Sequence, residues 1–179
     1  MDTLETNNNQ PIEMPVSRTG LRYGLIGGLL SIALSLAMFL TGAVSFDAEG
    51  GGNWVQTLLS VALYLGVLIM AINAHKKLQG GTITFGKAFG VAAVATVVMA
   101  VLSAIFTYIY FSFIDPEVLE MAYEKAIEQM ESQGQDPEQV AGILKSSLSA
   151  AAMSIYSLIG GVILGMIVSL ILALIQKNA

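Results

Sequence analysis

The sequence predicts an all-α membrane protein with four transmembrane helices and an extracytoplasmic amphipathic helical hairpin between helices three and four. Two observations predict this class. The 179 residues are 55% hydrophobic and only 12% charged, whereas about a quarter of the residues in a soluble domain are charged. The charges are also segregated, because four long stretches contain no Asp, Glu, Lys, Arg or His: residues 23–44, 55–74, 88–114 and 146–176.

Each stretch is long enough for one membrane crossing. Roughly 20 apolar residues, rising about 1.5 Å each, cover about 30 Å of hydrocarbon. In the last stretch the weakly apolar "SSLSAAAMS" precedes the strongly apolar part, so the crossing lies late. We therefore expect a disordered, polar cytoplasmic leader and one membrane domain: leader 1–19, domain 20–179, spans at about 21–44, 54–75, 86–114 and 153–176.

Basic residues predict the orientation, because Lys and Arg accumulate in cytoplasmic loops. On one side of a four-span chain lie Arg18, Arg22, Lys76, Lys77, Lys87 and Lys177, whereas Lys125 and Lys145 lie on the other. We therefore expect both termini in the cytoplasm. The N-terminus lacks the basic start and adjacent apolar core of a cleavable signal, so the first span should remain as an anchor.

The predicted outer hairpin covers residues 115–152. Asp115 is expected to cap a helix whose first residue is Pro116, since Asp is a good N-cap and Pro suits the first helical turn. Gly134 should end this helix, and Asp136-Pro137 should start a second one. On the first helix, an apolar face is predicted opposite an acidic stripe: Leu119, Ala122, Tyr123, Ala126, Ile127 and Met130 against Glu117, Glu120, Glu124, Glu128 and Glu131.

This acidic stripe has two interpretations. It is either a solvated helix face, which is what charge runs on amphipathic helices usually are, or a surface that binds a cation or a basic partner. Repulsion between neighbouring glutamates costs a few tenths of a kcal/mol per pair, roughly, which is too little to require a cation.

Small residues predict close helix packing. The fourth span has Ser157, Gly161, Gly165 and Ser169 at intervals of four, and the first has Gly24 and Gly28. Membrane helices gain packing energy where small residues let their backbones approach. We expect a contact between spans one and four within the monomer, with homodimerisation through one stripe as the alternative.

No constellation of catalytic residues is recognisable. The chain has no Cys, and its only histidine, His75, is expected among the lipid headgroups. The segment Gly81 to Lys87 fits GxxxxGK, but Ala88 replaces the hydroxyl residue that binds magnesium. Since no ionisable residue lies deep within a span, we expect neither an enzyme nor a cofactor, a metal site or a nucleic-acid partner.

Four features in order resemble one family: "RYGLIGGLLS", "GGTITFGKAFGVA", "YFSFIDPEVLE" and the glycine-rich last helix. They are similar to the bacterial membrane family catalogued as domain of unknown function 4199, over roughly residues 17–177. The resemblance implies a small multi-pass protein of the bacterial cytoplasmic (inner) membrane with no established activity. It supplies no catalytic residues.

Together these features favour a structural, regulatory or accessory subunit in the lipid bilayer. The acidic hairpin is then the contact surface for a membrane-protein partner or for a second copy of the chain. The alternative is a small transporter or channel with the glutamates at its outer mouth, since hydroxyls and backbone can line a channel without deep charges.

Overall fold

A computed structural model of the chain describes residues 15–41, 54–134, 136, 138 and 140–177. These residues form helices and contain no β-strand. In chain order the elements are α1 (Val16–Leu40), α2 (Trp54–Leu78), α3 (Phe85–Ile109), the π-helix η1 (Tyr110–Ile114), α4 (Glu117–Ser132), α5 (Ala141–Ser147) and α6 (Ala150–Gln176).

Four helices are long and apolar enough to cross a membrane, as predicted: α1, α2, α3 continued by η1, and α6. Their outward surfaces are apolar. Leu29 of α1, Leu164 and Ile175 of α6 are 60%, 67% and 72% exposed. Such side chains favour lipid tails over water, which fits a protein that is surrounded by a bilayer.

The helix bounds differ from the predicted spans mainly at their ends. Residues 16–19, which the sequence analysis placed in the leader, are part of α1, and residues 42–44 lie outside the described residues. α2 continues to Leu78 and α6 begins at Ala150. The first span was predicted from the uncharged stretch that begins at residue 23, but α1 also contains Arg18 and Arg22, since a long basic side chain can lie on a helix without ending it.

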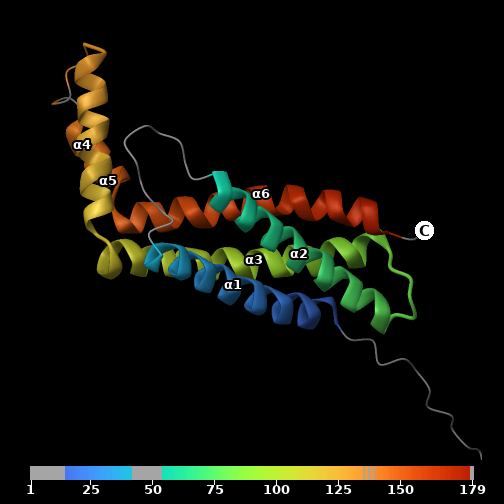
Figure 1. Cartoon of the computed structure of the whole chain (residues 1–179). Coiled ribbons are helices and arrows are strands. Elements are labelled where there is room, and N and C mark those ends of the chain that lie inside the picture. The colour runs from blue at the N-terminus through green and yellow to red at the C-terminus, as the bar shows by residue number, and fades with distance from the viewer. Residues whose placement is uncertain (1–14, 42–53, 135, 137, 139, 178–179) are drawn as a thin grey trace, which may run out of the picture.

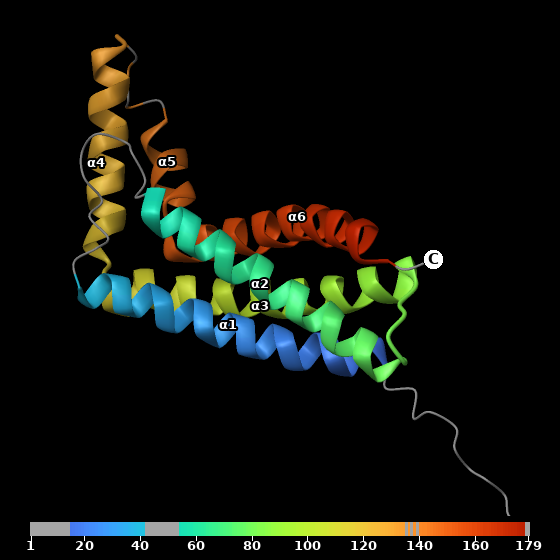
Figure 2. The same cartoon turned by 45° about the vertical axis from the view of Figure 1, so that its right-hand side comes forward.

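The bundle is organised around α3. Figures 1 and 2 show α1 and α6 packed along different sides of α3, with α2 crossing over them. The first turn of α1, the α2–α3 connection and the end of α6 lie together at one end of the bundle (Figure 1). The end of α3, the helices α4 and α5 and the start of α6 lie at the other end.

The α2–α3 connection is a tight glycine turn. Gly80 and Gly81 have φ values of 80° and 95°, a region that side chains with a Cβ rarely adopt. The Gly81 N–H donates to the Lys76 carbonyl at 3.0 Å, which ends α2. Thr84 occupies the N-cap position of α3, although its side chain makes no capping hydrogen bond.

The start of α4 differs from the prediction. Pro116 is the N-cap and no side chain caps the helix, so Asp115 does not have its expected role. Instead Asp115 ends η1: its N–H donates to the Tyr110 carbonyl at 2.9 Å, and its carboxylate accepts from the Tyr110 hydroxyl at 3.4 Å. Both bonds hold Asp115 to Tyr110.

The second predicted outer helix corresponds to α5, which begins at Ala141; the predicted start at Pro137 lies outside the described residues. The Glu138 N–H donates to Asp136 Oδ1 at 3.1 Å, which closes a local turn before α5. Gly134, with φ 71°, follows the end of α4 and donates to the Glu131 carbonyl at 2.9 Å, as expected for a helix stop.

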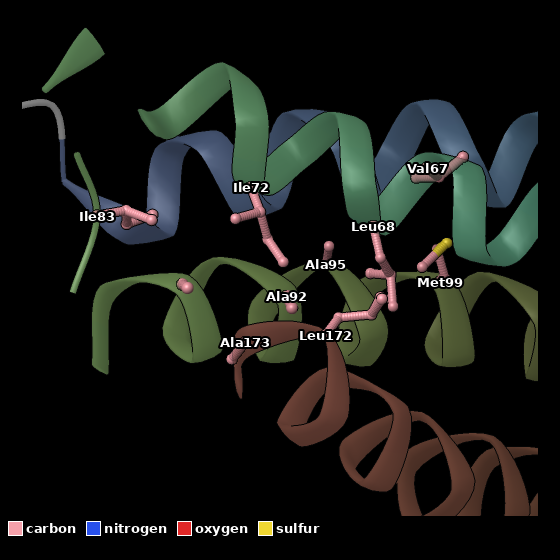
Figure 3. Packing of buried hydrophobic residues seen from close by; sticks show 10 residues of the cluster. Val67, Leu68, Ile72, Ile83, Ala92, Ala95, Met99, Leu172 and Ala173 are labelled. Carbon is pink, nitrogen blue, oxygen red and sulfur yellow. The ribbon is translucent and has the colours of Figure 1, made fainter. Parts of the chain in front are cut away.

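The apolar core fills the half of the bundle near the α2–α3 connection. Figure 3 shows Leu68 and Ile72 of α2 directed toward Ala92 and Ala95 of α3, with Leu172 of α6 beside them. Leu68, Ile72, Ala92 and Ala95 are completely buried. This half of the bundle is therefore tightly closed.

Candidate functional site

Small residues on α3 pack against the small residues of α1 and α6. Along α3 the small residues recur every four positions: Ala88, Ala92, Thr96, Ala100 and Ala104. A Cβ placed on Gly161 of α6 would lie 3.3 Å from the Ala100 Cβ, and one on Gly165 would meet the Thr96 methyl and the Tyr64 hydroxyl. The α6 stripe therefore packs on α3.

The α1 stripe also packs on α3. A Cβ on Gly24 would lie 2.7 Å from the Val98 Cβ and 2.8 Å from the Ala95 carbonyl oxygen, and one on Gly28 would meet Leu102. The expected contact between spans one and four is thus wrong, since each stripe uses α3. The small-residue line of α3 was the overlooked signal, because its alanines are less conspicuous than glycines.

Three hydroxyls form a chain across the middle of the bundle. The Tyr64 hydroxyl of α2 lies 2.8 Å from Thr96 Oγ1 of α3, which lies 3.1 Å from Ser169 Oγ of α6. Thr96 is 1% exposed and Ser169 is completely buried. A buried hydroxyl without a hydrogen-bond partner is costly. The three linked hydroxyls therefore hold α2, α3 and α6 together and fix the orientation of each helix about its own axis.

Ser169 was predicted to serve helix packing, and its bond to Thr96 was not predicted. Ser157, at the other end of the same stripe, lies 3.4 Å from the hydroxyl oxygen of Ser103 on α3. Hydroxyls on α6 thus contact hydroxyls on α3 at two levels. The spacing of Thr96 and Ser103 by seven residues places them on one face of α3 and is a signal that the sequence contained.

A cavity of about 190 Å³ adjoins the hydroxyl chain. Five hydroxyl side chains and six apolar or small residues line it: Ser31, Ser35, Tyr64, Thr96 and Ser103, with Gly28, Ile32, Met99, Ala100, Phe106 and Gly161. The lining residues come from α1, α2, α3 and α6, and apart from the Tyr64 phenol none of them is ionisable.

The cavity extends from the hydroxyl chain toward the end of the bundle that carries α4. In the opposite direction the buried side chains of Leu68 and Leu172 follow, one helical turn beyond Tyr64 and Ser169 respectively. The arrangement is therefore a pocket with a closed floor. In the described part of the chain no group of three or more His, Asp or Glu side chains is placed to hold a metal ion.

His75 was expected among the lipid headgroups. Instead, its side chain is completely buried within the protein. Its Nδ1 lies 3.1 Å from the Thr19 hydroxyl of α1, and the Gln79 side-chain amide donates to its Nε2 at 3.0 Å. With Nε2 as the acceptor, the ring is neutral and Nδ1–H donates to Thr19. Thr19 lies in the segment that was predicted to be part of the leader. The first turn of α1, which the prediction left out, therefore covers the His75 ring.

The family described as "Protein of unknown function (DUF4199)" matches residues 22–178. The chain belongs to this family. Neither the curated proteins nor the solved structures contain a match.

In this DUF4199 member, the matched region includes every residue that lines the cavity and all of α4 and α5. The family description assigns no activity, so any function must be argued from the arrangement of the residues. Two features outside the apolar core have that potential: the cavity and the surface of α4.

The surface of α4 separates two kinds of residue. All five glutamates of the predicted stripe are exposed: Glu117, Glu120, Glu124, Glu128 and Glu131. The six predicted apolar positions are all half-buried, and Val118 at the start of the helix is 6% exposed. α4 runs across the direction of the bundle helices and extends past them, with α5 beside it (Figures 1 and 2).

Proposed function

We propose that this protein is an accessory subunit of the bacterial inner membrane, with a structural or regulatory role, which contacts a partner through α4. Both termini lie in the cytoplasm, and α4 and α5 form an extracytoplasmic hairpin. The arrangement of basic residues supports this orientation: Arg18, Lys76, Lys87 and Lys177 belong to the bundle end that is opposite α4.

The observation that carries the proposal is the position of α4 with its exposed glutamates. A helix of 16 residues is about 24 Å long. Of these residues only Val118 is buried, so α4 contributes little to the core of the bundle. A long helix that projects past the bundle and adds little to its stability is well placed to contact another molecule.

The charge of α4 defines the kind of partner. Glu120, Glu124 and Glu128 recur at intervals of four along one side of the helix and are all exposed. Their carboxylates would pair with Lys or Arg side chains, and such pairs guide association and select the partner. We therefore infer that the partner presents a basic surface at the outer face of the membrane.

The test is chemical crosslinking in membranes, followed by affinity capture of the wild-type chain and of the triple variant E120Q/E124Q/E128Q. The variant keeps the size and hydrogen-bonding capacity of the side chains but removes three charges. We expect a captured partner that the variant loses. Without crosslinking, the complex should dissociate when salt is raised from about 0.1 M to about 1 M, where the screening length falls from about 10 Å to about 3 Å.

A charge-matched control is D2N/E5Q/E13Q, which removes three acidic residues near the N-terminus. This control should capture the same partner as the wild-type chain. If both triple variants lose the partner equally, net charge and not the α4 surface is responsible. If neither loses it, α4 does not make the contact through its glutamates, and the proposal is wrong.

A second candidate function is a small transporter, which the cavity favours. Hydroxyl groups inside a bundle can replace part of the hydration of a polar solute. The closed floor formed by Leu68 and Leu172 would have to open on the opposite side of the membrane. Flux into liposomes containing the purified protein tests this candidate: saturable uptake of a small solute would support it, whereas tight vesicles would favour the accessory subunit.

A further inference from the structure

We propose that the cavity between α1, α2, α3 and α6 binds a small neutral molecule that has one hydroxyl group on an apolar ring, such as a phenol or a cyclic alcohol. This inference does not depend on a partner at α4. It rests on the volume of the cavity, the hydroxyl chain at one end and the lack of charge in the lining.

The volume suits a single ring with one or two substituents. The cavity measures about 190 Å³, whereas an apolar cavity of about 150 Å³ is sufficient for benzene. Met99 and Phe106 supply polarisable and aromatic surface for a ring. A larger molecule would have to extend out of the cavity.

The hydroxyl chain selects the polar group. Tyr64, Thr96 and Ser169 have three O–H groups but only two bonds between them, so one O–H has to find a partner elsewhere. When the donors run from Ser169 toward Tyr64, the Tyr64 O–H is available to a ligand. When they run the other way, the Tyr64 oxygen accepts from a ligand. A ligand hydroxyl can serve in both cases, because it donates and accepts, whereas a carbonyl fits only the first.

The lining also excludes ions. Among the described residues no acidic or basic side chain lines the cavity, and a charge that loses its water without gaining a countercharge is strongly disfavoured there. Gly28 and Gly161 contribute backbone to the lining and no side chain.

The experiment measures binding of 4-fluorophenol by ¹⁹F NMR to the full-length protein in nanodiscs. The probe also enters the lipid, so every measurement is compared with a variant in the same lipid. S35F fills the cavity with a ring, and A33F places the same ring on an exposed position of the same helix. We expect 4-fluorophenol to bind the wild type and A33F, and not S35F. Equal signals from all three would overturn the proposal.

A second probe, 4-fluorotoluene, has nearly the same shape but no hydroxyl. A single hydrogen bond contributes about 1 kcal/mol, so the wild type should bind 4-fluorophenol about fivefold more tightly. In Y64F this preference should disappear while 4-fluorotoluene still binds. If the wild type binds both probes equally, the cavity is a site for hydrocarbon such as a lipid tail, and the proposal of a hydroxyl ligand is wrong. This comparison remains decisive even if S35F does not fold.

Discussion

The Nδ1 atom of His75 lies 3.1 Å from the Thr19 hydroxyl, so a buried hydrogen bond joins α2 to the first turn of α1. The other ring nitrogen accepts from Gln79, which begins the α2–α3 connection. The single histidine of the chain thus ties three segments together at the end of the bundle opposite α4. Its role is structural, and it gives the first prediction.

We expect Thr19→Val to lower the stability by about 1–3 kcal/mol, because it leaves the buried N–H of His75 without an acceptor. The shape of the side chain is nearly unchanged, so the loss should not come from packing. The measurement is the midpoint of thermal unfolding in detergent. Ser17→Ala, an exposed position on the same turn, is the control and should change little. Equal midpoints for wild type and Thr19→Val would contradict the bond.

Two glycines should respond oppositely to the addition of one methyl group. Gly24→Ala places its Cβ 2.7 Å from the Val98 Cβ and 2.8 Å from the rigid Ala95 carbonyl oxygen. We expect it to destabilise the protein by about 1–3 kcal/mol through overpacking. Gly66→Ala meets no atom within 4 Å, so its unfolding midpoint should stay the same or rise slightly. A neutral Gly24→Ala would show that α1 does not pack on α3 as described.

The bond between Tyr64 and Thr96 should be measurable by a double-mutant cycle. Tyr64→Phe and Thr96→Val each remove one hydroxyl, and the double variant removes both. Hydrogen bonds between membrane helices contribute about 0.6 kcal/mol on average and up to about 1.7 kcal/mol. We expect the double variant to lose less stability than the sum of the two single losses, by an amount in this range. Additive losses would mean that the hydroxyls do not interact.

The glutamates of α4 should not matter for folding. All of Glu120, Glu124 and Glu128 are exposed, and substitutions at such positions usually change stability by less than about 0.5 kcal/mol. E120Q/E124Q/E128Q should therefore unfold at the wild-type temperature, or slightly above it because repulsion is relieved. A clear loss of stability would show that the stripe serves the fold, and would weaken its assignment as a contact surface.

The sequence was sufficient to predict the four spans, because the absence of charge over about 20 residues is a strong and local signal. The turn at Gly80 and Gly81 was also predictable from composition, since few other residues adopt positive φ. The separation of glutamates from apolar residues on α4 followed from helical periodicity alone. These features share one property: each depends on residues that are close together in the chain.

The missed features depend on residues that are far apart. The burial of His75 on α2 requires Thr19 of α1. No local pattern in the sequence indicates which face of α2 is covered by α1. In the same way, the stripe containing Gly24 was evident, but its partner α3 was not, because small residues on several helices compete for it. The cavity could not be predicted, since it arises where four helices fail to fill the space between them.

The most direct test of the account is the position of α4 relative to the membrane. The chain contains no Cys, so single cysteines can replace Asn8, Glu49, Thr82, Glu128 and Asn178 without background. In intact spheroplasts we expect an impermeant maleimide to label only the second and fourth of these positions, and to label all five after permeabilisation. Labelling of position 8 or 82 in intact spheroplasts, or protection of position 128, would contradict the orientation and remove the proposed contact surface from the outside of the cell.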